Sequence, residues 1–71
     1  MREFNSKLPK ECIDRLNEYL VDEELKKCGG VIHSIYGYCR ALCDIGILTL
    51  GERIEITDIC MERYFKERYG K

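Results

Sequence analysis

The sequence has almost no net charge and none of the short motifs that mark enzyme active sites. Its 71 residues include 12 basic and 13 acidic side chains, so the formal net charge is −1. The strongly basic composition typical of nucleic-acid-binding domains is therefore missing. The sequence also contains no glycine-rich phosphate loop, no HExxH motif and no paired-carboxylate motif. We therefore expect that the protein is not an enzyme.

Long hydrophobic runs are missing as well. Residues Met1 to Ser6 contain no apolar run of the kind found in signal peptides. The most apolar segment, residues 29–50, includes His33, Arg40 and Asp44, and each of these side chains is costly in lipid. We therefore expect a cytoplasmic protein that does not associate with a membrane.

The five cysteines are an odd number and include no CxxC pair. Cytosolic thiols are usually reduced, and free cysteine behaves as a small buried hydrophobic residue. We therefore expect no disulfide framework, no bound metal and no cofactor, and slow labelling of Cys28, Cys39 and Cys43 in the folded state. The single histidine, His33, is expected to be an exposed polar side chain, because no nucleophile accompanies it.

Composition and periodicity predict one all-α domain over residues 1–71, arranged as a three-helix bundle with a long central helix. Apolar residues make up 45% of the chain and charged residues 35%, which is typical of a globular protein. The first helix is predicted from Pro9 to Leu20, because proline suits a first helical turn and one face of this segment is apolar. That face consists of Cys12, Ile13, Leu16, Tyr19 and Leu20.

The long central helix is predicted from Glu23 to Asp44, with Asp22 as its cap. Its main support is a ladder of apolar residues at alternating spacings of 3 and 4 that continues across Gly29 and Gly30. A helix break at this pair is the alternative, since each glycine costs about 1 kcal/mol in a helix interior. The unbroken ladder favours one helix. Its members are Leu25, Cys28, Ile32, Ile35, Cys39 and Leu42.

The third helix is predicted from Leu50 to Tyr69. Thr49 and Glu52 have the spacing of a capping box at its start. Ile56 and Ile59 fall outside the apolar face predicted for this helix, which weakens the pattern. The predicted core face consists of Leu50, Ile54, Met61, Tyr64 and Phe65.

A short β-hairpin is the alternative for residues 47–56. Residues 53–56 alternate between polar and apolar side chains, which is typical of a strand. This strand would pair with residues 47–50 around Gly51 and Glu52. We favour the helix.

The central helix carries few charges beyond its first turns, since only Arg40 and Asp44 are charged between residues 29 and 50. We therefore expect it to be covered on most sides. Small residues line one stripe of its surface, where another backbone could approach closely. Either a neighbouring helix of the same bundle packs there, or the stripe is an interface with a second copy or a protein partner. The candidate interface residues are Gly30, Ser34, Gly37, Ala41, Tyr36 and Tyr38.

The last nine residues form a second candidate site. Basic side chains there are interleaved with aromatic ones, a pattern that can contact phosphates while rings stack on bases. The same cations would also stabilise the C-terminal end of a helix, so nucleic-acid binding is not favoured. The candidate contacts are Arg63, Lys66, Arg68 and Lys71.

The sequence GYCRALCDIGILT at residues 37–49, followed by Glu52 and Arg53, resembles short helical open reading frames from phages and mobile elements of Gram-positive bacteria. Some small phage proteins bind and block host machinery, anti-CRISPR proteins among them. The resemblance therefore implies a protein–protein interaction module of phage or mobile-element type. It would act as a stoichiometric inhibitor of a host defence or nucleic-acid enzyme. The alternative is a small nucleic-acid-binding regulator.

Overall fold

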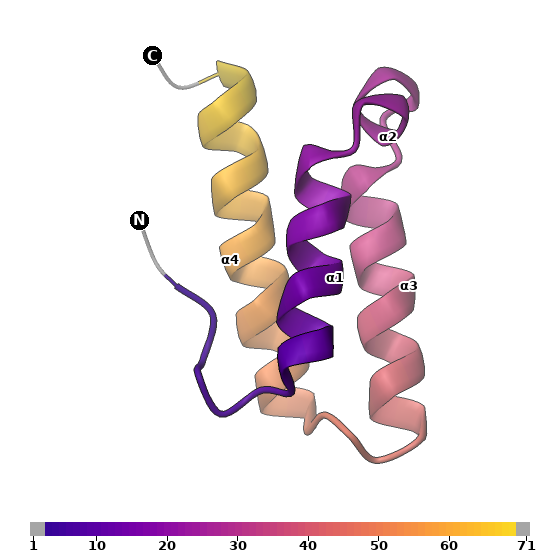
Figure 1. The fold of residues 1–71 in the computed structure, drawn as a ribbon, viewed down its shortest axis with the longest axis vertical. Coiled ribbons are helices and arrows are strands. Elements are labelled where there is room, and N and C mark those ends of the chain that lie inside the picture. Colours follow the sequence, from indigo (N-terminus) through magenta and orange to yellow (C-terminus); the bar gives the residue numbers. More distant parts are fainter. Residues whose placement is uncertain (1–2, 70–71) are drawn as a thin grey trace.

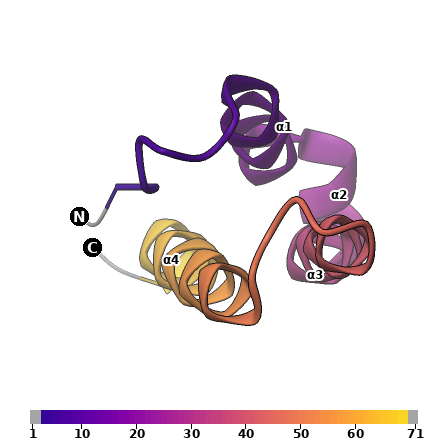
Figure 2. The ribbon, with the colours of Figure 1, turned by 90° about the horizontal axis from the view of Figure 1, so that it is seen from below.

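The described part of the chain folds into four α-helices and contains no strand. The structure is a computed structural model that describes the backbone of residues 3–69 and the side chains of residues 3–66. Helices α1 (Lys10–Val21), α3 (Val31–Asp44) and α4 (Leu50–Tyr69) lie side by side, and the short α2 (Glu23–Cys28) connects α1 to α3 at one end (Figure 1). Viewed along their axes, the three long helices form a triangle (Figure 2). The all-α prediction is confirmed.

The prediction of one continuous helix from residue 23 to 44 is wrong, because the chain breaks at the glycine pair. Gly29 adopts a left-handed conformation with φ 72° and ends α2. The backbone N–H of Gly30 then donates to the carbonyl of Leu25 at 2.9 Å. Glycine adopts this conformation without a Cβ clash, and it commonly ends helices in this way. The chain turns there, and α3 begins anew at Val31.

Two predicted helix caps are confirmed. The Asp22 carboxylate accepts a hydrogen bond from the backbone N–H of Leu25 at 3.1 Å, which caps α2. At the start of α4, the Thr49 N–H donates to Glu52 Oε1 at 2.8 Å, and the Glu52 N–H donates to Thr49 Oγ1 at 3.1 Å. These reciprocal bonds satisfy N–H groups that a helix start leaves without intrahelical partners. Residues 50–56 are helical, so the hairpin alternative is wrong.

The core lies between α1, α3 and α4. The face of α4 that is buried in it is not the face that the sequence pattern predicted. Ile56 and Ile59 are buried together with Cys60, whereas the predicted core residues Leu50, Ile54, Met61 and Phe65 are exposed. Tyr64, also predicted in the core, is half-buried against it. Helix α4 has apolar side chains on two faces, and the space between α1 and α3 accommodates only one of them. The buried hydrophobic residues are Leu8, Cys12, Leu16, Leu20, Val31, Ile35, Cys39, Leu48, Ile56, Ile59 and Cys60.

Gly29 and Gly37, which are both exposed, provide a matched test of the helix break. A Cβ atom at either position meets no other atom within 4 Å, so only the backbone conformation differs between them. We expect Gly29→Ala to lower the free energy of unfolding by about 1–2 kcal/mol, because alanine is strained at positive φ. We expect Gly37→Ala to raise it by up to about 1 kcal/mol, because Gly37 lies within α3. Urea unfolding followed by circular dichroism measures both. A stabilising Gly29→Ala substitution would contradict the break.

Candidate functional site

A stripe of exposed apolar side chains runs along the outer face of α4. Leu50 is 64% exposed, Ile54 54%, Met61 38% and Phe65 45%. At 100° per residue these four positions fall within an arc of about 60°. We call these four residues the α4 stripe. The largest exposed apolar patch on a protein is often functional, and such patches commonly mark interaction sites.

The margin of the α4 stripe that faces α3 is basic and held in place. The Arg53 guanidinium lies over the Tyr36 ring, with its central carbon 5.0 Å from the ring centroid. Its Nη2 also donates a hydrogen bond to the Tyr36 hydroxyl at 2.9 Å. This stacking joins α4 to α3 across the surface, and Tyr36 is 44% exposed beside the stripe. Tyr36, an interface candidate from the sequence, therefore belongs to the same surface as the α4 stripe.

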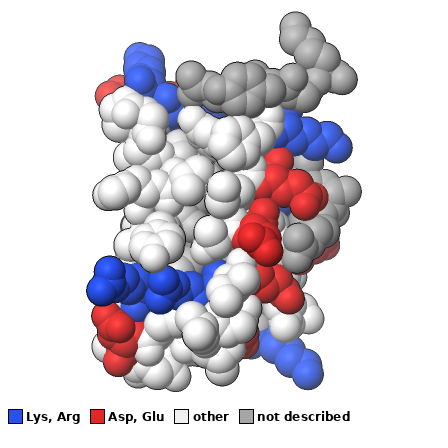
Figure 3. Space-filling model, turned by 180° about the vertical axis from the view of Figure 1, so that it is seen from behind, with Lys and Arg blue, Asp and Glu red and all other residues white. Residues whose placement is uncertain are grey.

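The opposite margin of the α4 stripe is acidic. Glu55, Asp58 and Glu62 are exposed on α4, and helical spacing places them on the side of the stripe away from Arg53. In the view from behind, an uncharged area runs lengthwise over the molecule (Figure 3). Basic side chains cross its left side below the centre, and acidic side chains gather on its right. The surface is therefore uncharged along its length, and near its middle a basic margin lies on the left and an acidic margin on the right.

The stripe of small residues on α3 is exposed at its C-terminal half. Gly37 and Ala41 are exposed, and a Cβ atom at Gly37 meets nothing within 4 Å. A neighbouring helix therefore does not cover Gly37 and Ala41, whereas Gly30 and Ser34 are half-buried. Tyr38 instead packs against Tyr19 of α1, with ring centroids 5.8 Å apart. An interface through these residues stays a prediction. The stripe is flanked by the exposed polar side chains His33, Arg40 and Asp44.

The cysteines differ in exposure, and one expectation about them is wrong. Cys12, Cys39 and Cys60 are buried and Cys43 is half-buried, but Cys28 is exposed because the break at Gly29 removes it from the apolar ladder. Burial raises the pKa of Cys39 to about 11 and that of Cys60 to about 12. Such thiols stay protonated and are poor nucleophiles at neutral pH. Among the described residues, no group of three or more His, Cys, Asp or Glu side chains is placed to hold a metal ion.

The basic residues near the C-terminus do not form one surface in the described part of the chain. The Arg63 guanidinium lies 4.6 Å over the Phe4 ring, and its Nη1 donates to Asn17 Oδ1 at 3.3 Å. Arg63 therefore ties the N-terminal segment and α1 to α4. Lys66 is exposed. The side chain of Arg68, and Lys71 as a whole, lie outside the described residues.

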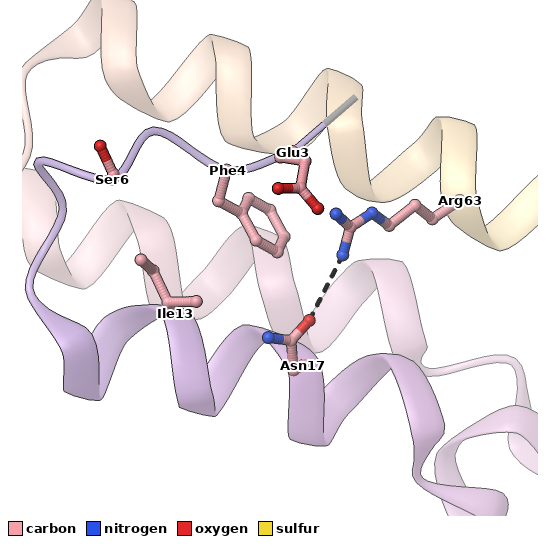
Figure 4. Close-up of a pocket in the computed structure, with 6 residues that line it drawn as sticks. All are labelled: Glu3, Phe4, Ser6, Ile13, Asn17 and Arg63. Atoms are coloured by element: carbon pink, nitrogen blue, oxygen red, sulfur yellow. Dashed lines mark hydrogen bonds between the residues drawn. The ribbon is translucent and has the colours of Figure 1, made fainter. Parts of the chain in front are cut away.

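Arg63 also lines an open cavity of about 430 Å³ beside the N-terminal segment. The Glu3 carboxylate points toward the Arg63 guanidinium across this cavity (Figure 4). A carboxylate at that position opposes the binding of a phosphate group. The lining residues are Glu3, Phe4, Ser6, Ile13, Asn17 and Arg63.

Comparison with protein-family models, curated proteins and solved structures finds no match to this chain. The resemblance to phage open reading frames therefore remains a prediction. Within the residues that the structure describes, no helix combines the length and apolar character needed to cross a membrane.

The buried thiols predict a loss of stability at alkaline pH. In the unfolded chain these thiols ionise near pH 9.0, whereas Cys39 and Cys60 keep their protons to about pH 11 and 12 in the folded state. Between these values the folded state binds more protons than the unfolded state, so the free energy of unfolding falls as pH rises above 9. Urea titrations at several pH values measure this slope.

Substitutions separate the contribution of the buried thiols from that of other groups. Cys60→Ala should make the slope of stability against pH shallower above pH 9, whereas Cys28→Ala, at an exposed thiol, should leave it unchanged. Equal slopes in all three proteins would contradict the assignment to buried thiols.

Proposed function

We propose that this chain is a small protein–protein interaction module that binds through the α4 stripe and acts stoichiometrically, without a catalytic step. The supporting observation is the exposure of Leu50, Ile54, Met61 and Phe65 on one side of a helix whose other side forms the core. A helix that presents an apolar stripe to a partner resembles a recurring mode of protein recognition. The basic and acidic margins would orient that partner.

The specific form of this proposal follows the sequence resemblance. A module of phage or mobile-element type would bind a host defence or nucleic-acid enzyme and block it, as anti-CRISPR proteins do. A small inhibitor of this kind needs one complementary surface. The α4 stripe with its two charged margins supplies such a surface in 71 residues.

A nucleic-acid-binding regulator is supported less well. Phosphate contacts supply most of the affinity for DNA and require accessible cations. Arg63 is held between Phe4 and Asn17, and the exposed side of α4 carries Glu55 and Asp58. These acids would repel the phosphate backbone.

Site-specific photo-crosslinking tests the proposed binding surface. Benzoylphenylalanine replaces Ile54 in the α4 stripe, or Val21, which is apolar and 66% exposed on α1. In living Gram-positive cells, light should link residue 54 to a discrete protein partner and leave residue 21 without that adduct. Asp58→Lys in the acidic margin should weaken the residue 54 adduct. Adducts that are absent, or equal at both positions, would overturn the proposal.

A further inference from the structure

The exposed side of α4 follows a heptad pattern. Leu50, Ile54, Thr57, Met61 and Tyr64 are separated by spacings of 4, 3, 4 and 3. These are the spacings of d and a positions in a coiled coil. The seam includes three residues of the α4 stripe, and Phe65 lies next to it. Leu50, Ile54 and Met61 are exposed, whereas Thr57 and Tyr64 are half-buried. The seam is therefore accessible to another helix mainly through its three exposed residues.

The charges beside the seam distinguish two orientations of a partner helix with the same sequence. Arg53 occupies a g position and Asp58 the following e position. In a parallel pair, each g residue faces the e residue of the partner, which places Arg53 opposite Asp58 twice. In an antiparallel pair, like positions face each other, so the two Asp58 side chains meet near the centre and repel. Among the described side chains, neither Arg53 nor Asp58 forms an ion pair within the chain.

The middle of this face shows the same asymmetry. In Figure 3, basic side chains cross the left side of the uncharged area and acidic side chains gather at the middle of its right side, whereas both signs of charge occur at its two ends. A twofold axis parallel to α4 exchanges left and right when it generates a second copy. The basic side of each copy then faces the acidic side of the other, and the same patch is used twice.

We propose that the α4 stripe binds a second copy of this chain, with the two α4 helices parallel around a twofold axis. This inference rests on the proposed function and names the partner of the same surface. The dimer interface proposed on α4 differs from the one that the sequence pattern predicts at the small-residue stripe of α3. At the α3 stripe, only the small size of the side chains suggests an interface.

The size of the α4 stripe sets the strength of this pairing. With about 200 Å² of accessible surface per large apolar side chain, the exposed parts of the stripe amount to on the order of 400 Å². Stable interfaces bury about 800 Å² on each partner, so we expect this dimer to be weak. The protein should therefore be monomeric in dilute solution and pair where it is concentrated.

Sedimentation velocity from about 10 μM to 1 mM tests the self-association. The average mass should rise from 8.4 kDa toward twice that value. Ile54→Asn should weaken association about tenfold or more. The matched control Val21→Asn, at an apolar residue that is also exposed, should leave it unchanged. A wild-type protein that remains monomeric at 1 mM, or equal effects of the two substitutions, would overturn the proposal.

Charge exchange and crosslinking test the parallel orientation. Arg53→Glu should weaken association about fivefold, because the new carboxylate lies opposite Asp58 of the other copy and the two repel. Asp58→Lys should have the same effect, because it places two cations opposite each other. The double variant should restore wild-type association, with circular dichroism as a check on folding because Arg53 also contacts Tyr36.

Leu50→Cys in a Cys28→Ser background should form a disulfide-linked dimer with oxidised glutathione. Failure of the double variant to restore association, or no linkage at residue 50, would overturn the parallel arrangement.

The photo-crosslinking of residue 54 separates the two proposals. A self-adduct has twice the mass of the chain, whereas an adduct with another protein has a different mass. A monomer at 1 mM that still crosslinks another protein through residue 54 would overturn self-pairing and keep the interaction surface. A dimer insensitive to Ile54→Asn, with no adduct at residue 54, would overturn both.

Discussion

The packing of α4 against α3 and α1 determines what the rest of the molecule can bury and what it must leave in water. Ile56 and Cys60 of α4 contribute to one core with Ile35 and Cys39 of α3 and Leu16 of α1. Arg53 on Tyr36 and Arg63 over Phe4 then hold α4 on either side of this core. With α4 held in this rotation, its second apolar face points outward. The exposed α4 stripe is thus a direct consequence of how the core is filled.

The small side chains in this core are suited to close helix packing. Cys12, Cys39 and Cys60 are buried on the three long helices. A thiol is small and apolar enough to fill space between larger residues such as Leu16 and Ile56. Burial also raises the pKa of these thiols, so they remain neutral and need no charged partner. Cys12, Cys39 and Cys60 therefore serve packing.

Local signals in the sequence predicted the helix starts well, because a cap depends on residues that are close in the chain. Asp22, and the pair Thr49 and Glu52, form the predicted hydrogen bonds. The break at Gly29 was missed because apolar spacing reports which residues share a face and says little about φ at one glycine. Ile32, Ile35 and Cys39 keep their predicted apolar side in α3 on the far side of that break.

The candidate site was harder to predict, because it depends on which of two faces the rest of the fold selects. Both faces of α4 are apolar enough to enter a core, and only the docking against α1 and α3 decides between them. The sequence pattern placed Leu50, Ile54, Met61 and Phe65 inside, where the structure has Ile56, Ile59 and Cys60. The signal that could have found the site was the pair of off-face isoleucines, which already indicated a second face.

The position of the core residues also has a consequence for the order of synthesis. The α4 residues that complete the core, Ile56, Ile59 and Cys60, come late in the chain. During translation, α1, α2 and α3 therefore emerge first. At that stage Leu16 and Ile35 lack the contacts with α4 that bury them in the folded protein. Emerging chains expose hydrophobic surface until a domain can close as a unit. On a polysome, neighbouring nascent chains would pass through this open stage close to one another, before any of them has an α4 helix to cover its core.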